Sequence, residues 1–236
     1  CCTACSKDEE SFKGKDADAS LSIAVKAVGS AVTKGVHPND ENELAGEAKV
    51  NNLSVLVFDE SGAQLIGYGW QATNSEGEAS ILNVPAMTMR AQIVIVSNTP
   101  ENSLAGVTSY SDFESKLAQL ADQSQSNLVM SSPVITTQAP LVKGYNYLGY
   151  ASMGSENING IAEPVEITRL AARLDLVNVK TDFTKTLLRN RTVRVEEVTI
   201  LNQSTASRFF SRDYWGVVMA TGHLGNSDAT CLLYTS

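Results

Sequence analysis

Leu53-Ser54-Val55-Leu56-Val57-Phe58 is a run of β-branched and apolar residues, and Asp59-Glu60-Ser61-Gly62 follows it directly. A run of this composition is typical of a β-strand, and the residues after it are ones that favour a tight turn. Gln64 to Trp70 then forms a second strand-like stretch. The pattern predicts a β-hairpin and a fold built mainly from strands.

Two further stretches outside the hairpin have strand patterns. Ile93-Val94-Ile95-Val96 is an unbroken β-branched run that ends at Asn98, which predicts a strand covered on both faces. Nearer the N-terminus, Leu21, Ile23 and Val25 alternate with small or polar residues. This period of two predicts a half-buried strand with these three side chains on one face.

One segment, residues 111–123, has a helical pattern. Ser111 and Glu114 have the spacing of a capping box. The residues expected on one apolar face are Tyr110, Phe113, Leu117 and Leu120. We expect this face to pack into the core, and the helix to be the single one in the N-terminal part of the chain.

A change in charge divides the chain near residue 164. Residues 1–165 carry 9 basic and 19 acidic side chains, whereas residues 166–236 carry 9 and 7. A stretch rich in Gly and Asn, Gly154 to Gly160, precedes Pro164, and strands are expected at Val165–Val179 and Thr192–Leu201. We therefore predict an N-terminal β-sandwich domain at residues 20–164 and the start of a C-terminal β-sandwich domain, cut short, at residues 165–230.

The chain begins Cys1-Cys2-Thr3-Ala4-Cys5-Ser6-Lys7-Asp8-Glu9-Glu10. A small residue before a cysteine, followed by a charged stretch, is typical of the end of a bacterial lipoprotein signal peptide, after which the cysteine is acylated. We expect lipid attachment at Cys5, with residues 1–4 as a signal peptide remnant and residues 5–19 as the lipidated N-terminus and tether. The alternative is an ordinary solvated acidic terminus.

The other end of the chain reads Cys231-Leu232-Leu233-Tyr234-Thr235-Ser236. In one reading frame this matches the translation of the transposase adaptor end used in tagmentation sequencing libraries. We therefore expect residues 231–236 to be derived from a sequencing adaptor. The alternative is a genuine strand that begins Leu-Leu-Tyr.

Composition argues against several classes of function. The net charge of −8 argues against nucleic acid as a partner. No uninterrupted apolar run approaches 18 residues, which argues against a membrane-spanning helix. His37 and His223 are the only histidines and neither has a plausible ligand pair beside it, so no metal site is predicted.

Motifs for catalysis or cofactor binding are also missing from the sequence. No Gly-x-Ser-x-Gly elbow or phosphate-binding loop occurs. Gly67-Tyr68-Gly69-Trp70-Gln71-Ala72 fits a loose dinucleotide pattern, but a polar turn follows it where a helix is needed. The acids Asp40, Glu41, Glu43 and Glu47 lack EF-hand spacing and are interpreted as a solvated loop. We predict no catalytic residue and no cofactor, and favour a structural or binding protein over an enzyme.

Several stretches together resemble the Bacteroidales fimbrillin family, whose members are subunits of type V pili. They are Ala4-Cys5-Ser6-Lys7-Asp8; Asn52 to Asp59 with Gly62; Val84-Pro85-Ala86 leading to Ile93–Asn98; and Ile167-Thr168-Arg169-Leu170-Ala171-Ala172-Arg173-Leu174-Asp175-Leu176. Each stretch is short, but their order and spacing match that family's landmarks. The resemblance covers residues 5–230.

This resemblance implies two transthyretin-like or Ig-like β-sandwich domains and export as an outer-membrane lipoprotein at the cell surface. It further implies a structural role in a fimbrium that serves adhesion and biofilm formation, with other fimbrial subunits as partners in a homopolymer or a mixed pilus. Assembly in the family proceeds by strand exchange after an arginine-specific protease removes the first strand. Here that strand would be the one carrying Leu21, Ile23 and Val25.

The expected cleavage site departs from the family's pattern. No arginine occurs before Arg90, and Lys34 stands where family members have an arginine after the first strand. Either a lysine-accepting, trypsin-like protease cuts after Lys34, or the subunit is not processed and serves as an anchor or terminator.

A second class of function is a surface lipoprotein that binds a glycan or another host ligand and does not polymerise. Tyr145, Tyr147, Tyr150 and Trp215 could stack on sugars. Because aromatic residues make up only 6% of the chain, we interpret these four as core residues.

Overall fold

The computed structural model describes residues 17–28, 44–151, 156–171, 187, 191–198, 204–209 and 217–219. Its strands are β1 (Ala19–Val28), β2 (Lys49–Asp59), β3 (Leu65–Glu76), β4 (Glu78–Ala86), β5 (Ala91–Ser97), β6 (Leu117–Gln119), β7 (Met130–Ser131), β8 (Ile135–Thr136), β9 (Gly144–Leu148), β10 (Val165–Arg169), β11 (Ser204–Arg208) and β12 (Val217–Met219). The helical elements are α1 (Tyr110–Ser115) and the short 3-10 turns η1 (Leu120–Asp122) and η2 (Ile158–Gly160). The expected mainly β fold is confirmed, whereas the number of domains stays a prediction.

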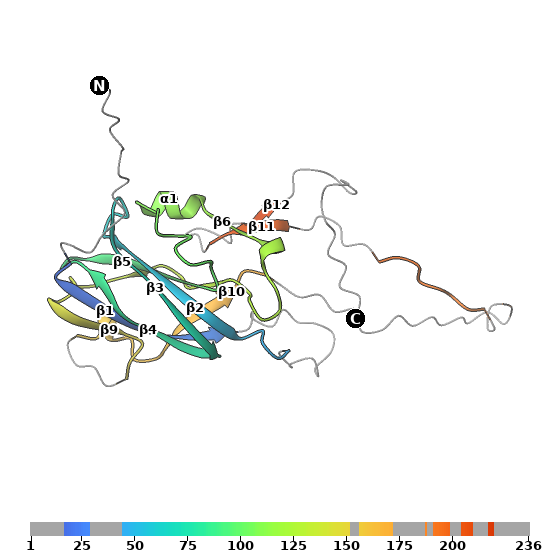
Figure 1. Cartoon of the computed structure of the whole chain (residues 1–236), viewed down its shortest axis with the longest axis horizontal. Helices are drawn as coiled ribbons and strands as arrows, with labels where there is room; N and C mark the ends of the chain where they lie inside the picture. The colour runs from blue at the N-terminus through green and yellow to red at the C-terminus, as the bar shows by residue number, and fades with distance from the viewer. Residues whose placement is uncertain are drawn as a thin grey trace, which may run out of the picture.

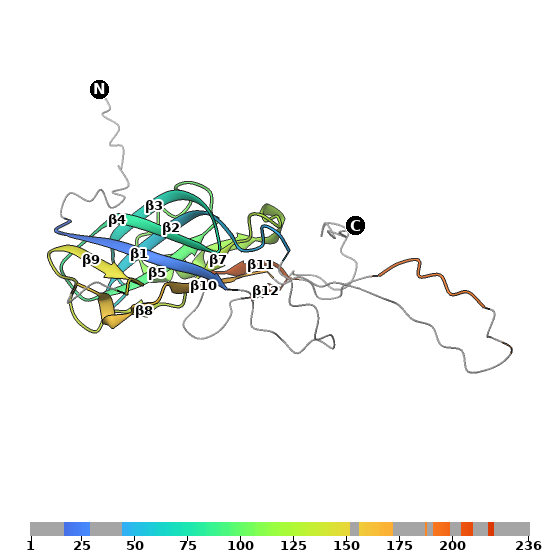
Figure 2. The same ribbon diagram turned by 90° about the horizontal axis from the view of Figure 1, so that it is seen from below.

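Most strands belong to one large sheet with the order β3-β2-β5-β7-β10-β1-β4, with β8 added beside β5 and β9 beside β1. The sheet curls, so that β2 and β5 face β1 and β4 across a shared apolar interior, and α1 lies on the far side of β2 and β5 (Figure 1). Figure 2 shows the same layers from below, with β1 running along the layer that also holds β9.

The predicted hairpin is present as β2 and β3, which pair antiparallel. Its turn is organised by Asp59, whose carboxylate accepts hydrogen bonds from the backbone N–H of Ala63 at 2.8 Å and from the hydroxyl of Ser61 at 3.0 Å. Gly62 has a φ of 76°, a conformation that glycine adopts without steric cost. The turn residues identified in the sequence therefore form the turn.

The prediction that Ile93–Val96 is covered on both faces is confirmed. Ile93 and Ile95 belong to the interior between the two layers, and Val94 and Val96 to a second cluster on the side of α1. β2 shows the same division, because Val55 and Val57 enter the first cluster and Leu56 and Phe58 the second. β2 and β5 pair at the centre of the fold and are buried on both faces, which explains why these two stretches are almost entirely apolar.

The predicted helix at 111–123 is wrong in its extent and in its cap. α1 spans only Tyr110–Ser115, and Ser109 caps it by accepting a hydrogen bond from the N–H of Asp112. Tyr110 and Phe113 are buried as expected, but Leu117 is 41% exposed. The chain leaves the helix at Lys116 because the next residues form β6, which pairs with β11. A tertiary strand pairing thus ends the helical pattern early.

The large sheet continues past the predicted boundary at residue 164. β10 pairs parallel with β1 and antiparallel with β7, although the sequence pattern assigns its residues to a second domain. Residues 192–198 of the expected strand at Thr192–Leu201 lie outside any sheet, and residues 172–179 of the other expected strand lie outside the described residues. Phe209, beyond β11, stacks on Phe113 with ring centroids 5.4 Å apart.

Two glycines let β3 cross closely over β4. A Cβ atom at Gly69 would lie 2.8 Å from the nearest methyl carbon of Val84, and one at Gly67 would collide with the backbone carbonyl oxygen of Pro85. The methyl group could shift slightly, but the carbonyl belongs to a strand fixed by its own ladder. Gly67 is therefore the tighter of the two requirements for the curl of the sheet.

We expect Gly67→Ala to lower the free energy of unfolding by about 1–3 kcal/mol, because the added methyl group overpacks a site walled by backbone. The matched control is Gly106→Ala, where a Cβ would meet nothing within 4 Å and φ is not positive; its effect should be below about 1 kcal/mol in either direction. Urea unfolding followed by tryptophan fluorescence measures both. Equal effects would show that the crossing is not tight.

A buried ion pair joins the segment before β2 to the end of β10. Arg169 Nη1 lies 3.5 Å from Glu47 Oε2, and the two side chains are only 10% and 8% exposed. Glu47 also accepts a hydrogen bond from the N–H of Leu44 at 3.1 Å. The prediction that Glu47 belongs to a solvated acidic loop is therefore wrong, because Arg169, distant in sequence, packs against it.

We expect Glu47→Gln to destabilise the protein by roughly 2–4 kcal/mol, because it removes a negative charge that lies against a buried guanidinium. Glu60→Gln is the control: Glu60 lies closer to its partner Arg90, at 2.7 Å, but the side chains are 56% and 45% exposed. Its loss should cost less than about 1 kcal/mol, since water screens the exposed pair. A larger loss of unfolding free energy, measured by urea unfolding, for Glu60→Gln than for Glu47→Gln would contradict the conclusion that the buried pair stabilises the fold more than the exposed one.

Candidate functional site

β1 is the strand that carries the candidate site residues, and it has neighbours on both edges. One edge pairs antiparallel with β4, from Ala19 opposite Ala86 to Lys26 opposite Glu78. The other edge pairs parallel with β9 over Ala19–Ile23 and then with β10 over Val25–Val28. β1 is therefore an interior strand, although it lies near the start of the described chain.

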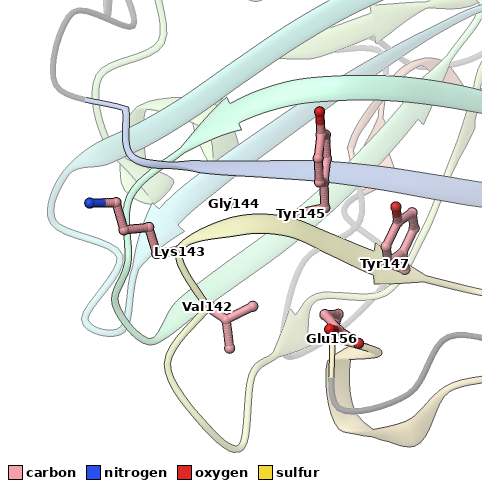
Figure 3. Close-up of a pocket in the computed structure, with 6 residues that line it drawn as sticks. All are labelled: Val142, Lys143, Gly144, Tyr145, Tyr147 and Glu156. Carbon is pink, nitrogen blue, oxygen red and sulfur yellow. The ribbon is translucent and has the colours of Figure 1, made fainter.

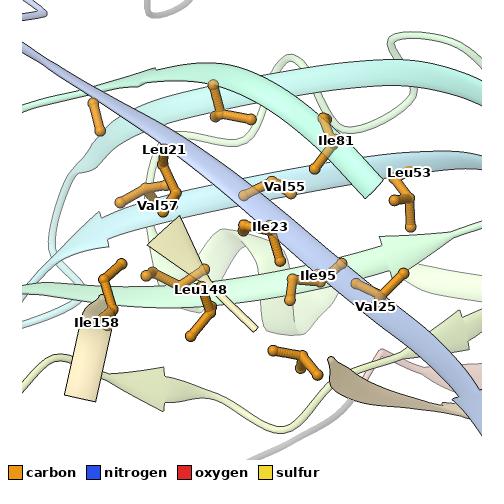
Figure 4. Packing of buried hydrophobic residues seen from close by; sticks show 14 of the residues in the cluster. Leu21, Ile23, Val25, Leu53, Val55, Val57, Ile81, Ile95, Leu148 and Ile158 are labelled. Atoms are coloured by element: carbon orange, nitrogen blue, oxygen red, sulfur yellow. The ribbon is translucent and has the colours of Figure 1, made fainter. Parts of the chain in front are cut away.

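The inner face of β1 is completely buried. Leu21, Ile23 and Val25 are each 0% exposed and project into the interior between the two layers (Figure 4). Around them in the same cluster are Leu53, Val55 and Val57 from β2, Ile95 from β5, Ile81 from β4 and Leu148 from β9. The alternation predicted for these three residues is confirmed as a strand, and β1 contributes side chains to the centre of the core.

The outer face of β1 carries Ser20 and Ser22, and a β-bulge in the neighbouring strand fits against them. The register between β1 and β4 shifts between Leu21 and Ile23. At the bulge Asn83 has a φ of 57°, and its N–H donates a hydrogen bond to Ser22 Oγ at 3.3 Å. The bulge fixes the register of the strand that lies beside β4.

Asp18 fixes the start of β1. Its carboxylate accepts a hydrogen bond from the N–H of Thr88 at 2.8 Å, and its backbone carbonyl accepts one from the N–H of Gly144 at 3.0 Å. The bond from Thr88, which favours the charged carboxylate, lowers the pKa of Asp18 below its ordinary value. At the other end, the N–H of Ala27 donates to the carbonyl of Gly77 at 2.7 Å.

The other predicted site residues are not part of this arrangement. Cys5, the expected lipid attachment point, and Lys34, the expected cleavage site, lie outside the described residues. Within the described ranges no group of three or more His, Cys, Asp or Glu side chains could hold a metal ion. The described part of the chain also contains no helix that is long and apolar enough to cross a membrane.

A shallow hollow of about 470 Å³ opens beside β9, on the outer face of the layer that holds β1. It is lined by Val142, Lys143, Gly144, Tyr145, Tyr147 and Glu156 (Figure 3). Tyr145 is 63% exposed, so its interpretation as a core residue is wrong. Tyr147 and Tyr150 are partly buried, and Trp215 lies outside the described residues.

Tyr147 and Tyr150 pack edge to face, with ring centroids 5.8 Å apart and planes at 80°. Burial raises the pKa of Tyr150, and an interaction with the side chain of Ser80 on β4 acts in the opposite direction. Tyr150 thus lies near β4 as well as near Tyr147 of β9. The register of β9 beside β1 places both Tyr145 and Tyr147 on the outer face, and the contact with Tyr150 covers Tyr147 but leaves Tyr145 exposed. That register depends on tertiary pairing and has no signal in the local sequence.

Comparison with known proteins gives two family matches in sequence order. A family described as "Major fimbrial subunit protein (FimA)" matches residues 19–169. A second, described as "Fimbrium tip subunit Fim1C-like, C-terminal domain", matches residues 170–235.

Among curated proteins, the chain is 46% identical over 231 residues to the "Putative fimbrium tip subunit Fim1C" of Parabacteroides distasonis, covering 97% of this chain and 61% of the relative. It is 26% identical over 214 residues to a major fimbrium subunit FimA type-2 of Porphyromonas gingivalis, covering 88% and 50%. The chain therefore spans between half and three fifths of these relatives. They are fimbrial proteins, not enzymes, in agreement with the expectation from sequence.

Solved structures show the same relationship. The chain matches a crystal structure of a "putative cell adhesion protein" from Parabacteroides distasonis with a TM-score of 0.79 and 44% sequence identity, covering 89% of this chain and 62% of the other. A second cell adhesion structure from that organism matches with a TM-score of 0.57 at 22% identity, covering 89% and 55%. The second match shows a shared fold.

Proposed function

Because the chain belongs to the Bacteroidales fimbrillin family, we propose that it is a structural subunit of a cell-surface fimbrium that serves adhesion, and that it joins its neighbour by exchange of β1. The observation that carries this proposal is the position of β1, which is hydrogen-bonded on both edges and has an inner face that is 0% exposed at Leu21, Ile23 and Val25.

Removal of β1 would leave a groove of defined shape. One wall would be β4 and the other β9 followed by β10, and each wall would expose unpaired backbone donors and acceptors. The floor would be apolar, because Val55, Ile95 and Leu148 surround the inner face of β1. Open strand edges above an apolar floor are a template for a strand from another chain.

The bulge at Asn83 adds a requirement for the replacing strand. Any strand that follows the register of β1 places one residue beside the N–H of Asn83, where β1 supplies the hydroxyl of Ser22. Apolar residues at the positions of Leu21, Ile23 and Val25 would fill the floor. The replacing strand therefore needs an alternating pattern with a small polar residue between its first two apolar ones.

Covalent connection explains why β1 stays in place before assembly. A short flexible linker holds a tethered segment at an effective concentration in the millimolar range. Cleavage after Lys34 would end this advantage. A free strand at micromolar concentration is about 10³-fold more dilute than the tethered strand, which weakens its occupancy of the groove by about 4 kcal/mol. A strand on a neighbouring subunit could replace it. In this proposal a protease that accepts lysine performs the cleavage.

We place the subunit at the tip of the fimbrium. The support is the similarity to the Fim1C tip subunit and to the Fim1C-like C-terminal domain. In a linear assembly made by strand exchange, the subunit at one end needs only to accept a strand from its single neighbour. The groove left by β1 would accept that strand. The partners are then other fimbrial subunits in a mixed fimbrium.

The proposal includes export as an outer-membrane lipoprotein with the acyl chains on Cys5. More than one chain is needed for stable attachment, since a single acyl chain binds membranes only marginally. The acidic stretch after Cys5 would keep the tether solvated.

Limited proteolysis with trypsin, followed by N-terminal sequencing, tests the cleavage step. We expect a new N-terminus at Gly35, and its disappearance in Lys34→Ala but not in the control Lys49→Ala. A fluorescent peptide with the sequence of residues 17–28 should then enter the cleaved chain and not the uncleaved one.

The peptide control carries Asp in place of Ile23, which puts a charge in the apolar floor and should abolish uptake. Equal uptake of both peptides, or uptake by the uncleaved chain, would contradict exchange at the β1 groove. A first cut elsewhere, with residue 35 still joined to residue 34, would contradict the choice of Lys34.

A further inference from the structure

Tyr145 is the one aromatic residue among the large apolar side chains that are exposed in the described part of the chain. It lies on β9, opposite Ser20 of β1 in the parallel register, and therefore on the outer face of the layer. Tyr147 projects to the same side of β9 as Tyr145 (Figure 3). Whereas Tyr147 is covered by Tyr150, Tyr145 is 63% exposed and its side chain is accessible to a ligand.

The surroundings of Tyr145 combine apolar surface with a few polar groups. Val142, which is 39% exposed, adds aliphatic surface, and Lys143 and Glu156 place one positive and one negative charge at the rim. Gly144 contributes no side chain to the lining. The space beside it is open, because a Cβ built there would meet nothing within 4 Å. The hollow of about 470 Å³ falls within the range of roughly 300–1,000 Å³ that small-molecule sites occupy.

The hollow is held in shape by buried hydrogen bonds. Asn146, only 2% exposed, accepts from the N–H of Val142 and donates to its carbonyl, both at 2.8 Å, and so closes the turn that leads into β9. The N–H of Tyr147 donates to the backbone carbonyl of Glu156 at 2.9 Å, which ties the two rims together. A site ordered before binding loses little conformational entropy when a ligand enters.

We propose that this hollow binds a neutral pyranose sugar, as the terminal residue of a glycan. One face of a pyranose ring carries weakly positive C–H groups, which are attracted to the negative face of an aromatic ring such as that of Tyr145. The hydroxyls of the sugar can donate to the carboxylate of Glu156 and accept from the ammonium of Lys143. Because these two charges balance, the hollow favours a neutral sugar over a charged one.

Other ligand classes fit the hollow less well. A protein partner needs a larger apolar area than Tyr145 and Val142 provide. Nucleic acid needs a cluster of cations, whereas among the described residues Lys143 is the only cation that lines the hollow.

Saturation-transfer NMR on the uncleaved chain tests the proposal, with the methyl glycosides of D-galactose, D-mannose, N-acetyl-D-glucosamine and L-fucose as probes and that of sialic acid as the charged comparator. We expect transfer to at least one neutral sugar. Tyr145→Ala should raise its Kd at least about fivefold, whereas Tyr145→Phe, which keeps the ring, should stay within about twofold.

Two further variants separate sugar binding from effects on folding. Glu156→Gln weakens the hydroxyl acceptor and leaves the backbone bond to Tyr147 intact, so we expect weaker sugar binding with unchanged thermal unfolding. Leu117→Ala removes another exposed apolar side chain, 41% exposed and outside the hollow, and should change nothing. No transfer to any neutral sugar, or equal Kd values for Tyr145→Ala and the unaltered chain, would overturn the proposal.

This inference does not depend on the fimbrial proposal. The uncleaved chain is sufficient for the NMR measurement, so a failure to bind sugar leaves strand exchange untouched, and a failure of strand exchange leaves the sugar site untouched.

Discussion

The pairing of β1 on both edges is the constraint on which the rest of the described structure depends. β4 joins the large sheet through one edge of β1, and β9 and β10 pair with the other edge, where β10 connects β1 to β7 and β5. The side chains of Leu21, Ile23 and Val25 fill the space between the two layers. Both the backbone ladder and the apolar interior are therefore completed by the same ten-residue strand. A fold built in this way needs a substitute for β1 once β1 is lost, which is the physical basis for the proposed assembly by exchange.

The same dependence links the two surfaces discussed above. β9 positions Tyr145 and Tyr147, and β9 is held in place by its parallel register with β1. A strand that replaced β1 would therefore restore the pairing of β9, which carries Tyr145 and Tyr147, as well as the core. If it restored the register of Ser20 and Ser22, the hollow would keep its shape in the assembled fimbrium. Ligand binding would then take place on β9, and subunit joining at the neighbouring position of β1.

Local patterns in the sequence were sufficient to predict the elements in which each face is either clearly buried or clearly exposed. The hairpin of β2 and β3, the fully apolar β5 and the alternation in β1 follow from periodicity and turn residues, because burial imposes the pattern directly. The failures share a different cause. The helix ends at Lys116 because β6 pairs with β11, Glu47 is buried because Arg169 reaches it, and Tyr145 is exposed because of the register of β9. Each depends on a partner distant in sequence, for which periodicity carries no signal.

Amide hydrogen exchange at residue resolution on the uncleaved chain tests the central role of β1 most directly. If β1 completes the ladder and the core as described, its hydrogen-bonded amides should exchange only through global unfolding, as slowly as those of β2 and β5. Rapid exchange throughout β1 while β2 and β5 stay protected would contradict this account, because it would show that the sheet and the interior persist without the strand.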